Sequence, residues 1–291
     1  MKWPFVATLT TAGALLALVS SAGQDSTQTS RGGPGKPPVV SAAAAPAGTE
    51  ALAVQWLKVT APGQGVMLAA VARPPGTGPF PTVLVLHGTH GFAQQYVQLA
   101  QDLARGGLIA VAACWFSGGS GAGLRFVTPI GCPEAPTMAP NSSPDPLQTW
   151  TVDALVQAVR ALPGARPDRV ALVGHSRGGG ATLNYLLKVD NVQAAVLHSA
   201  GYATQPATHA AQFNAPILIL HGTADSPVDG GSANTNVQLA RDFEAALRRE
   251  GKPVEAKYYE GGAHETFFTS STQHDDEVQA IVAFLRRHLL N

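Results

Sequence analysis

One serine stands in a sequence context that would make it a nucleophile. Ser176 is the centre of Gly174-His-Ser-Arg-Gly178, which fits the pattern G-x-S-x-G. The apolar run Val170–Val173 predicts a buried strand before it, and Ala181–Leu187 predicts a helix after it. A strand that turns sharply into a helix leaves the turn residue strained and exposed above the sheet. This context predicts nucleophilic chemistry at the Ser176 hydroxyl, and an ordinary glycine-rich turn is the alternative.

The residues around Ser176 support this prediction for a steric and an electrostatic reason. Gly174 and Gly178 would let the strand and helix backbones approach closely. The helix start places free N–H groups and the positive end of the helix dipole beside the serine. An oxyanion that forms at Ser176 would be stabilised at this position.

A serine hydroxyl needs a base, and the base needs an orienting acid. After a turn of this kind the acid and then the histidine are expected at the ends of later strands. Asp225 follows the predicted strand Pro216–Leu220, and Asp229 is the alternative acid. His264 lies in the glycine-rich loop after the last predicted strand. We therefore predict a catalytic triad of Ser176, Asp225 and His264.

The other histidines near strand ends are weaker candidates for the base. His87 and His221 each close a predicted strand before a glycine, and we expect them to hold loops by hydrogen bonds. His175 precedes the serine and is expected to point elsewhere. His198 ends a strand and is expected to help shape the site.

An oxyanion hole requires two N–H donors. One is the backbone N–H of the residue after the nucleophile, Arg177, and the other comes from the loop after the third predicted strand, Leu86–Gly91. Thr89 is the predicted donor in that loop, with His90 as the alternative. The Arg177 side chain itself is expected to be ion-paired or solvated.

Two residues are predicted to contact substrate. His90 belongs to the loop that would border the oxyanion. Phe116 opens the irregular stretch Phe116–Pro146, which leaves the carboxyl end of a strand, where sites of α/β proteins lie. A surface excursion without a binding role is the alternative for this stretch.

Strands alternate with amphipathic helices through the rest of the chain. The predicted strands are Ala51–Val59, Val66–Ala72, Pro81–Leu86, Leu108–Trp115, Val170–Val173, Ala194–Leu197, Pro216–Leu220 and Val254–Tyr259. Continuous apolar strands between amphipathic helices are typical of a parallel sheet covered on both faces. We predict an α/β fold with a mostly parallel eight-stranded sheet, and the segment Ser199–Asn214 is too short for a large lid domain.

Composition and charge exclude several partners. Charged residues make up 13% of the 291 residues, and the formal net charge is zero with histidine neutral. Without a basic block, we expect neither nucleic acid nor an anionic membrane surface as a partner. The two cysteines and the scattered histidines form no ligand set, so we predict neither a metal ion nor a cofactor.

The N-terminus reads as a targeting segment. Lys2 precedes an apolar run over Phe5–Val19, and the small residues that follow suit cleavage after Ala22. Residues 1–22 are therefore predicted to be a signal peptide, with an uncleaved membrane anchor as the alternative. Residues 23–48 have too little apolar surface to offset their ordering entropy and are predicted to be a disordered linker before the catalytic domain, 49–291. We expect a secreted or periplasmic protein without stable membrane insertion after cleavage.

The predicted export bears on the oxidation state of the two cysteines. In an oxidising compartment, Cys114 and Cys132 are predicted to form a disulfide. The alternative is that Cys114, at the end of an apolar strand, is simply buried.

From about residue 50 onward the chain resembles the α/β-hydrolases and, within them, the dienelactone hydrolase-like group. The resemblance rests on Leu86-His-Gly-Thr-His-Gly-Phe92, His221-Gly-Thr-Ala-Asp-Ser-Pro-Val228 and Gly261-Gly-Ala-His264, which resemble the group's oxyanion loop, acid turn and histidine loop. Dienelactone hydrolases proper have a cysteine nucleophile, whereas this chain has Ser176. The departure shifts the resemblance toward the serine esterases of the group.

This resemblance implies a serine hydrolase that cleaves carboxylic esters through an acyl-enzyme on Ser176. The segment Ser199–Asn214 is too short for a large lid, so we expect an open cleft. An open cleft suits small-molecule or polymeric esters, either short-chain or bulky. A serine peptidase or a thioesterase with the same triad is the alternative enzyme. A ligand-binding descendant without catalysis is the alternative of another class, and it would be expected to have lost a triad residue.

Overall fold

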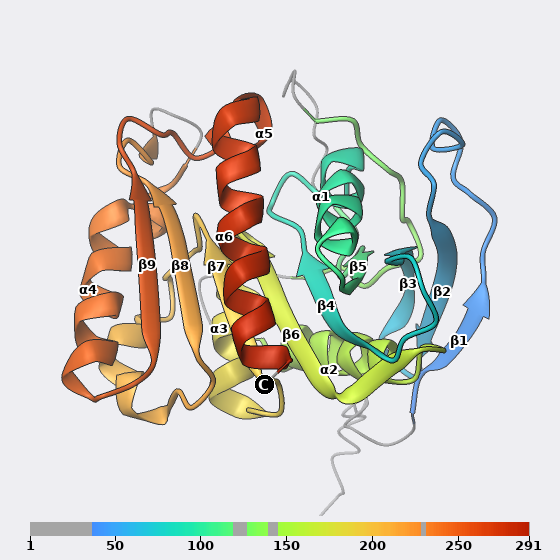
Figure 1. Ribbon diagram of the computed structural model, residues 1–291, viewed down its shortest axis with the longest axis horizontal. Helices are drawn as coiled ribbons and strands as arrows, with labels where there is room; N and C mark the ends of the chain where they lie inside the picture. Colours follow the sequence, from blue (N-terminus) through green and yellow to red (C-terminus); the bar gives the residue numbers. More distant parts are fainter. Residues whose placement is uncertain (1–36, 119–126, 139–144, 228–230, 291) are drawn as a thin grey trace, which may run out of the picture. The chain divides into compact units, whose positions relative to one another are not determined.

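A nine-stranded sheet forms the centre of the computed structural model, which describes residues 37–118, 127–138, 145–227 and 231–290. The strand order is β1-β2-β3-β5-β4-β6-β7-β8-β9 (Figure 1). The strands are β1 (Val39–Ala42), β2 (Gln55–Ala61), β3 (Gly65–Ala72), β4 (Phe80–Leu86), β5 (Ile109–Ala113), β6 (Ala165–His175), β7 (Ala194–His198), β8 (Ile217–Gly222) and β9 (Val254–Tyr259).

Most of the sheet is parallel, as predicted. Strands β1, β2, β3 and β5 pair antiparallel with one another, and every pair from β5 through β4 to β9 is parallel. Parallel strands point their carboxyl ends to one edge of the sheet, so the loops after β4, β6, β7, β8 and β9 meet there. The predicted fold class is confirmed, and the loops with the predicted site residues meet at this edge.

The ninth strand, β1, is a difference from the eight-stranded prediction. Val39–Ala42 lies within residues 23–48, which the composition predicted to be disordered. Its backbone pairs with β2, from Val39 opposite Thr60 to Ala42 opposite Leu57, although the Val39 side chain is 64% exposed. Main-chain hydrogen bonds at the sheet edge, rather than side-chain burial, therefore order this segment. The predicted signal peptide, residues 1–22, lies outside the described residues.

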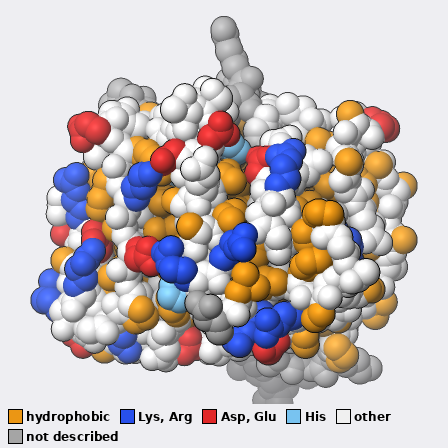
Figure 2. Space-filling view, viewed as in Figure 1, with side chains coloured by type: hydrophobic (Ala, Val, Ile, Leu, Met, Phe, Trp, Pro, Cys, Tyr) orange, Lys and Arg blue, Asp and Glu red, His pale blue; other side chains and the backbone are white. Residues whose placement is uncertain are grey.

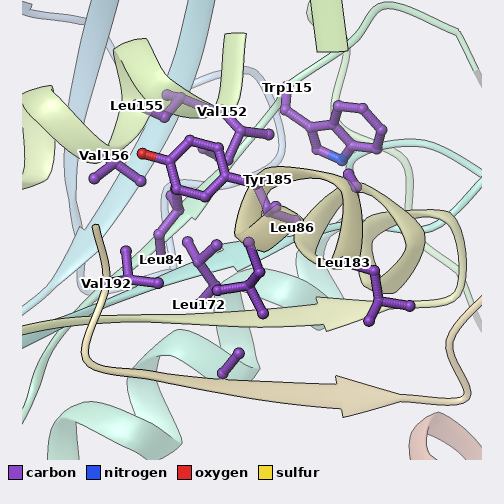
Figure 3. Close-up of a cluster of buried hydrophobic side chains, with 14 of the residues drawn as sticks. Leu84, Leu86, Trp115, Val152, Leu155, Val156, Leu172, Leu183, Tyr185 and Val192 are labelled. Carbon is purple, nitrogen blue, oxygen red and sulfur yellow. The ribbon is translucent and has the colours of Figure 1, made fainter. Parts of the chain in front are cut away.

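Helices cover both faces of the sheet (Figure 1). They are α1 (Gln94–Arg105), α2 (Pro146–Arg160), α3 (Arg177–Lys188), α4 (Val237–Arg249), α5 (Thr266–Thr269) and α6 (Ser271–Leu289), with the 3-10 helices η1 (Pro206–Gln212) and η3 (Ala233–Thr235). Side chains alternate between the two faces along a strand. Leu84 and Leu86 of β4 thus join the apolar cluster under α2, α3 and α4 (Figure 3), whereas Val83 and Val85 join the cluster under α1 and α6.

The connection between β7 and β8 is short, and all of it is described. It contains only η1, so no large lid domain is inserted there, as predicted. A disulfide joins Cys114, which directly follows β5, to Cys132, also as predicted. It fastens the segment 127–138 beside the carboxyl edge of the sheet.

On the face that carries α1 and α6, Lys and Arg side chains are interspersed with Asp and Glu (Figure 2). Arg287 of α6 pairs with Glu255 of β9 at 2.6 Å, and Lys257 pairs with Asp276. Among the described residues, none of the helices is both long enough and apolar enough to cross a membrane.

Candidate active site

Ser176 lies between β6 and α3, at the strand-to-helix turn that the sequence predicts. Its backbone has φ 53° and ψ −115°, a conformation that is strained for a residue with a side chain. A Cβ atom on Gly174 would lie 2.3 Å from the carbonyl oxygen of Gly178, and one on Gly178 would lie 2.2 Å from that of Leu86. Neither position has room for a side chain, so the glycines permit the turn that presents the serine.

The structure brings the three predicted triad side chains together. His264 Nε2 lies 3.0 Å from Ser176 Oγ, and His264 Nδ1 lies 2.7 Å from Asp225 Oδ2. All three are largely buried, with exposed fractions of 8% for Ser176, 4% for His264 and 2% for Asp225. The Nδ1–H donates to the carboxylate, which leaves the Nε2 lone pair to accept the serine proton. The alternative acid, Asp229, lies outside the described residues.

Asp225 accepts further hydrogen bonds that the sequence did not predict. His221 Nε2 lies 3.0 Å from Asp225 Oδ2, and the Thr235 hydroxyl donates to Oδ1 at 2.9 Å. Burial alone would raise the pKa of Asp225, but the hydrogen bonds and the electrostatic attraction from His221 and His264 outweigh it and lower the pKa to about 2. The carboxylate is therefore held ionised, as an orienting acid must be.

His221 was predicted to hold a loop by a hydrogen bond, and it does so in addition to its contact with Asp225. The same Nε2–H lies 2.7 Å from the carbonyl oxygen of Thr235, so one donor is shared between the loop and the triad acid. Its spacing of four residues before Asp225 in the turn after β8 was visible in the sequence, but the direction of the ring was not.

The loop after β4 lies against the nucleophile. A Cβ atom on Gly88 would be 3.1 Å from Ser176 Cβ, and Gly91 N–H bonds the carbonyl oxygen of Gly88. Thr89, at the tip of this turn, is exposed. Arg177 is the first residue of α3, where a backbone N–H has no acceptor within the helix. Both predicted oxyanion donors thus belong to segments that adjoin Ser176, and their role stays a prediction.

The Arg177 side chain packs over aromatic rings. Its guanidinium carbon lies 4.2 Å from the centre of the Phe116 ring and 5.7 Å from that of Trp115. Phe116 is 2% exposed and also packs against His87, with 4.6 Å between ring centres. Phe116 is therefore a buried support beneath Arg177, and its predicted contact with substrate is not visible as an exposed surface.

Further histidines pack beneath His264. The His175 ring centre lies 5.2 Å from that of His264 and 5.1 Å from that of His198. Burial, followed by the neighbouring histidines, holds the pKa of His175 well below its usual value, so this ring is neutral. His198 Nε2 in turn lies 2.6 Å from Glu277, a carboxylate of α6 that is 1% exposed. His198 thus lies near the site, as predicted. Glu277 is its buried partner, and the apolar spacing of the last predicted helix gave no sign that this carboxylate faces the interior.

One group of side chains has the composition of a metal site. His175, His264 and Glu265 each offer an atom within 4.8 Å of the others. Both ring nitrogens of His264 already face Asp225 and Ser176, so a metal ion there would have to displace a triad contact. The geometry is better suited to nucleophilic chemistry than to metal binding.

Known proteins resemble most of this chain in sequence. A model of the dienelactone hydrolase family matches residues 67–288. A Bradyrhizobium protein named as a probable 2-oxo-3-(5-oxofuran-2-ylidene)propanoate lactonase is 26% identical over 234 residues, which cover 74% of this chain and 85% of that protein.

Solved structures show the same fold. A Klebsiella pneumoniae structure assigned as a dienelactone hydrolase superposes with a TM-score of 0.58 at 22% identity, covering 76% of this chain and 92% of that one. A Pyrococcus furiosus esterase superposes with a TM-score of 0.63 at 13% identity, covering 87% of this chain and all of that one. Because the family model matches most of the chain, the predicted resemblance is confirmed: this protein belongs to the dienelactone hydrolase family and is a hydrolase of the α/β-hydrolase fold.

Proposed function

We propose that this protein is a secreted serine hydrolase that cleaves carboxylic esters through an acyl-enzyme on Ser176. The observation that supports this most strongly is the continuous chain of contacts from Ser176 Oγ through His264 to Asp225, at 3.0 and 2.7 Å. A histidine between a hydroxyl and a buried carboxylate is the arrangement that activates serine for acyl transfer.

In the proposed reaction His264 removes the Ser176 proton as the serine oxygen attacks the ester carbonyl. The backbone N–H groups of Arg177 and Thr89 stabilise the tetrahedral oxyanion. His264 then gives the proton to the leaving alcohol, and the acyl group stays on Ser176. In the second half, His264 takes a proton from water, whose oxygen attacks the acyl-enzyme. As the acid is released, His264 returns the proton to Ser176 Oγ and the free enzyme is restored.

The proposed substrates are short-chain or bulky esters, including exposed ester groups of polymers. The short β7–β8 connection supports this, because no large lid domain is inserted at this fully described connection. Lactones are cyclic esters and would undergo the same attack, and the relative named as a lactonase favours testing them beside open-chain esters.

Export is proposed from two features. The apolar N-terminal segment of the sequence suits a signal peptide that is cleaved after Ala22, and the Cys114–Cys132 disulfide suits an oxidising compartment. N-terminal sequencing of the exported protein tests this, with Gly23 expected as the first residue.

Hydrolysis of p-nitrophenyl esters from acetate to palmitate by purified wild type and Ser176→Ala tests the enzymatic proposal. We expect activity to fall steeply with acyl length and to be absent in a folded Ser176→Ala protein. Wild-type turnover by Ser176→Ala would refute the nucleophile. No turnover by wild type on any ester, together with no labelling of Ser176 by a fluorophosphonate, would favour a ligand-binding protein. Preferential cleavage of peptide or thioester substrates would instead favour the other two enzyme classes.

A further inference from the structure

A fully buried tyrosine hydroxyl lies behind the nucleophile and has three polar partners. Tyr96 is on α1, and its Oη accepts the backbone N–H of Gly88 at 2.8 Å. The same oxygen lies 2.8 Å from His90 Nε2 and 2.8 Å from His175 Nδ1. Gly88 and His90 belong to the loop that is predicted to hold the oxyanion, and His175 immediately precedes Ser176. One hydroxyl therefore joins the oxyanion loop to the nucleophile turn.

The number of available protons determines which groups donate and which accept at the Tyr96 hydroxyl. A tyrosine hydroxyl has one hydrogen to donate, and the Gly88 N–H occupies one of its lone pairs. Burial lowers the pKa of His90 to about 4 and that of His175 well below its usual value, so each ring has one N–H and one lone pair. Tyr96 must therefore donate to one histidine and accept from the other. The two rings consequently adopt opposite roles toward the hydroxyl.

Glu265, the residue after His264, faces the far side of both rings. Its Oε1 lies 3.8 Å from His90 Nδ1, and its Oε2 lies 3.9 Å from His175 Nε2. In either arrangement of protons, one N–H and one lone pair point toward this carboxyl group. Burial raises the pKa of Glu265. Both separations are longer than a hydrogen bond, so Glu265 acts on the rings electrostatically. A protonated carboxyl would match the polarity of both nitrogens, because it presents one O–H and one acceptor oxygen.

We propose that Tyr96, together with His90, His175 and Glu265, forms a ring of polar groups that positions the oxyanion loop against the nucleophile turn. We refer to these four residues as the Tyr96 ring. Tyr96 is a positioning residue in this proposal, since it acts on the reaction through Gly88 and the adjacent Thr89 N–H. The inference rests on the proposed serine hydrolase function.

The consequence is a selective loss of transition-state stabilisation. Without the hydroxyl, the Gly88 N–H loses its acceptor and both histidines lose a partner, so the loop is free to shift. Outright removal of an oxyanion donor lowers turnover by about 10²–10³-fold. A shifted donor should lower kcat by less, about tenfold to hundredfold. KM for a small ester should stay within about threefold, because the oxyanion forms only in the transition state.

Tyr96→Phe tests this, with Tyr185→Phe as the matched control. Tyr185 is also fully buried, and its hydroxyl lies 2.8 Å from Asp153 Oδ1 and 2.8 Å from Asn191 Oδ1, in the cluster under α2 and α3 (Figure 3). Each variant loses a buried hydroxyl, and both should melt below the wild type. Only Tyr96→Phe should lower kcat on p-nitrophenyl acetate. It should also bind a trifluoromethyl ketone, which forms a tetrahedral adduct with the serine, more weakly by a similar factor.

A kcat of Tyr96→Phe within twofold of wild type would overturn the proposal, as would an equal loss in Tyr185→Phe or a change confined to KM. Because Tyr96→Phe could fail to fold, Glu265→Leu and Glu265→Gln supply a second test. The glutamine keeps one donor and one acceptor, so its kcat should exceed that of the leucine variant by about tenfold. Equal kcat values in the two variants would also refute the ring. Activity of wild type and its absence in Ser176→Ala test the proposed function separately.

Discussion

His221 provides the sharpest test of the triad geometry, because it is a buried residue whose loss leaves all three triad residues in place. Its side chain is fully buried, and its Nε2–H is shared between Asp225 Oδ2 at 3.0 Å and the Thr235 carbonyl oxygen at 2.7 Å. Phenylalanine has a similar shape and no donor. His221→Phe therefore removes one donor from a buried carboxylate and leaves one buried carbonyl oxygen without its partner.

The magnitude follows from these two losses. A hydrogen bond to a charged group contributes about 1.5–3 kcal/mol, and an unsatisfied buried acceptor costs about 1–3 kcal/mol, so we expect the free energy of unfolding to fall by about 3 kcal/mol at pH 7. For a domain of this size that corresponds to a decrease in Tm of about 6–12 °C. The pKa of Asp225 should rise, because the hydrogen bond from His221 is the first of the contributions that lower it.

The effect on turnover should be smaller than that of losing the carboxylate. Asp225 keeps His264 and the Thr235 hydroxyl, so the tautomer of His264 is maintained, and we expect kcat to fall about tenfold. Loss of the orienting carboxylate costs about 10⁴-fold in serine proteases.

Urea unfolding and kcat on p-nitrophenyl acetate measure both effects, with His221→Gln as the control. The glutamine amide can donate where Nε2–H did, so this variant should recover part of each loss. A stability of His221→Phe within about 0.5 kcal/mol of wild type, with unchanged kcat, would refute the assigned hydrogen bonds. A loss of kcat near 10⁴-fold would show that His221 does more than hold the acid.

Three further predictions concern the acid, a half-buried histidine and the disulfide. Asp225→Asn should lower kcat by about 10³–10⁴-fold, whereas Asp229→Asn, the competing assignment, should leave kcat within about twofold of wild type. His274 Nε2 lies 2.9 Å from Asp102, and this bond raises the pKa of His274 above its unfolded value of 6.5. Its contribution to stability is therefore complete below pH 6.5 and disappears as the pH rises through the folded pKa, so His274→Gln should destabilise more at pH 6 than at pH 9 in urea unfolding; an equal loss at both pH values would refute the pairing. Cys132→Ser removes a disulfide across 18 residues and should lower stability by about 3 kcal/mol, and dithiothreitol should reproduce the decrease in Tm in wild type but not in the variant.

The sequence alone determined the fold class and the identity of the predicted triad. Ser176 is recognisable because strand, turn and helix are local patterns. Gly174 is required by a contact with Gly178 within the same strand-to-helix turn, whereas Gly178 is required by its contact with Leu86 of β4. Asp225 and His264 are recognisable because each follows a strand pattern, a continuous apolar run for Asp225 and an alternation of apolar and charged residues for His264. Parallel strands bring such loops to one edge whatever the details of packing, so the order of the elements sufficed.

Only the tertiary structure decided what surrounds these residues. Strand β1 forms because β2 provides main-chain hydrogen-bond partners at the sheet edge. The composition of residues 23–48, rich in polar and small residues, does not indicate that these partners are present. Phe116 was predicted to contact substrate, and the structure shows its ring buried against the Arg177 guanidinium of α3. The side chains of His221 and Tyr96 form hydrogen bonds with residues from other parts of the fold. His221 contacts Asp225 and Thr235, and Tyr96 contacts Gly88, His90 and His175. Their directions depend on the packing of α1 and of the turn after β8 against the site, and no local sequence pattern encodes them.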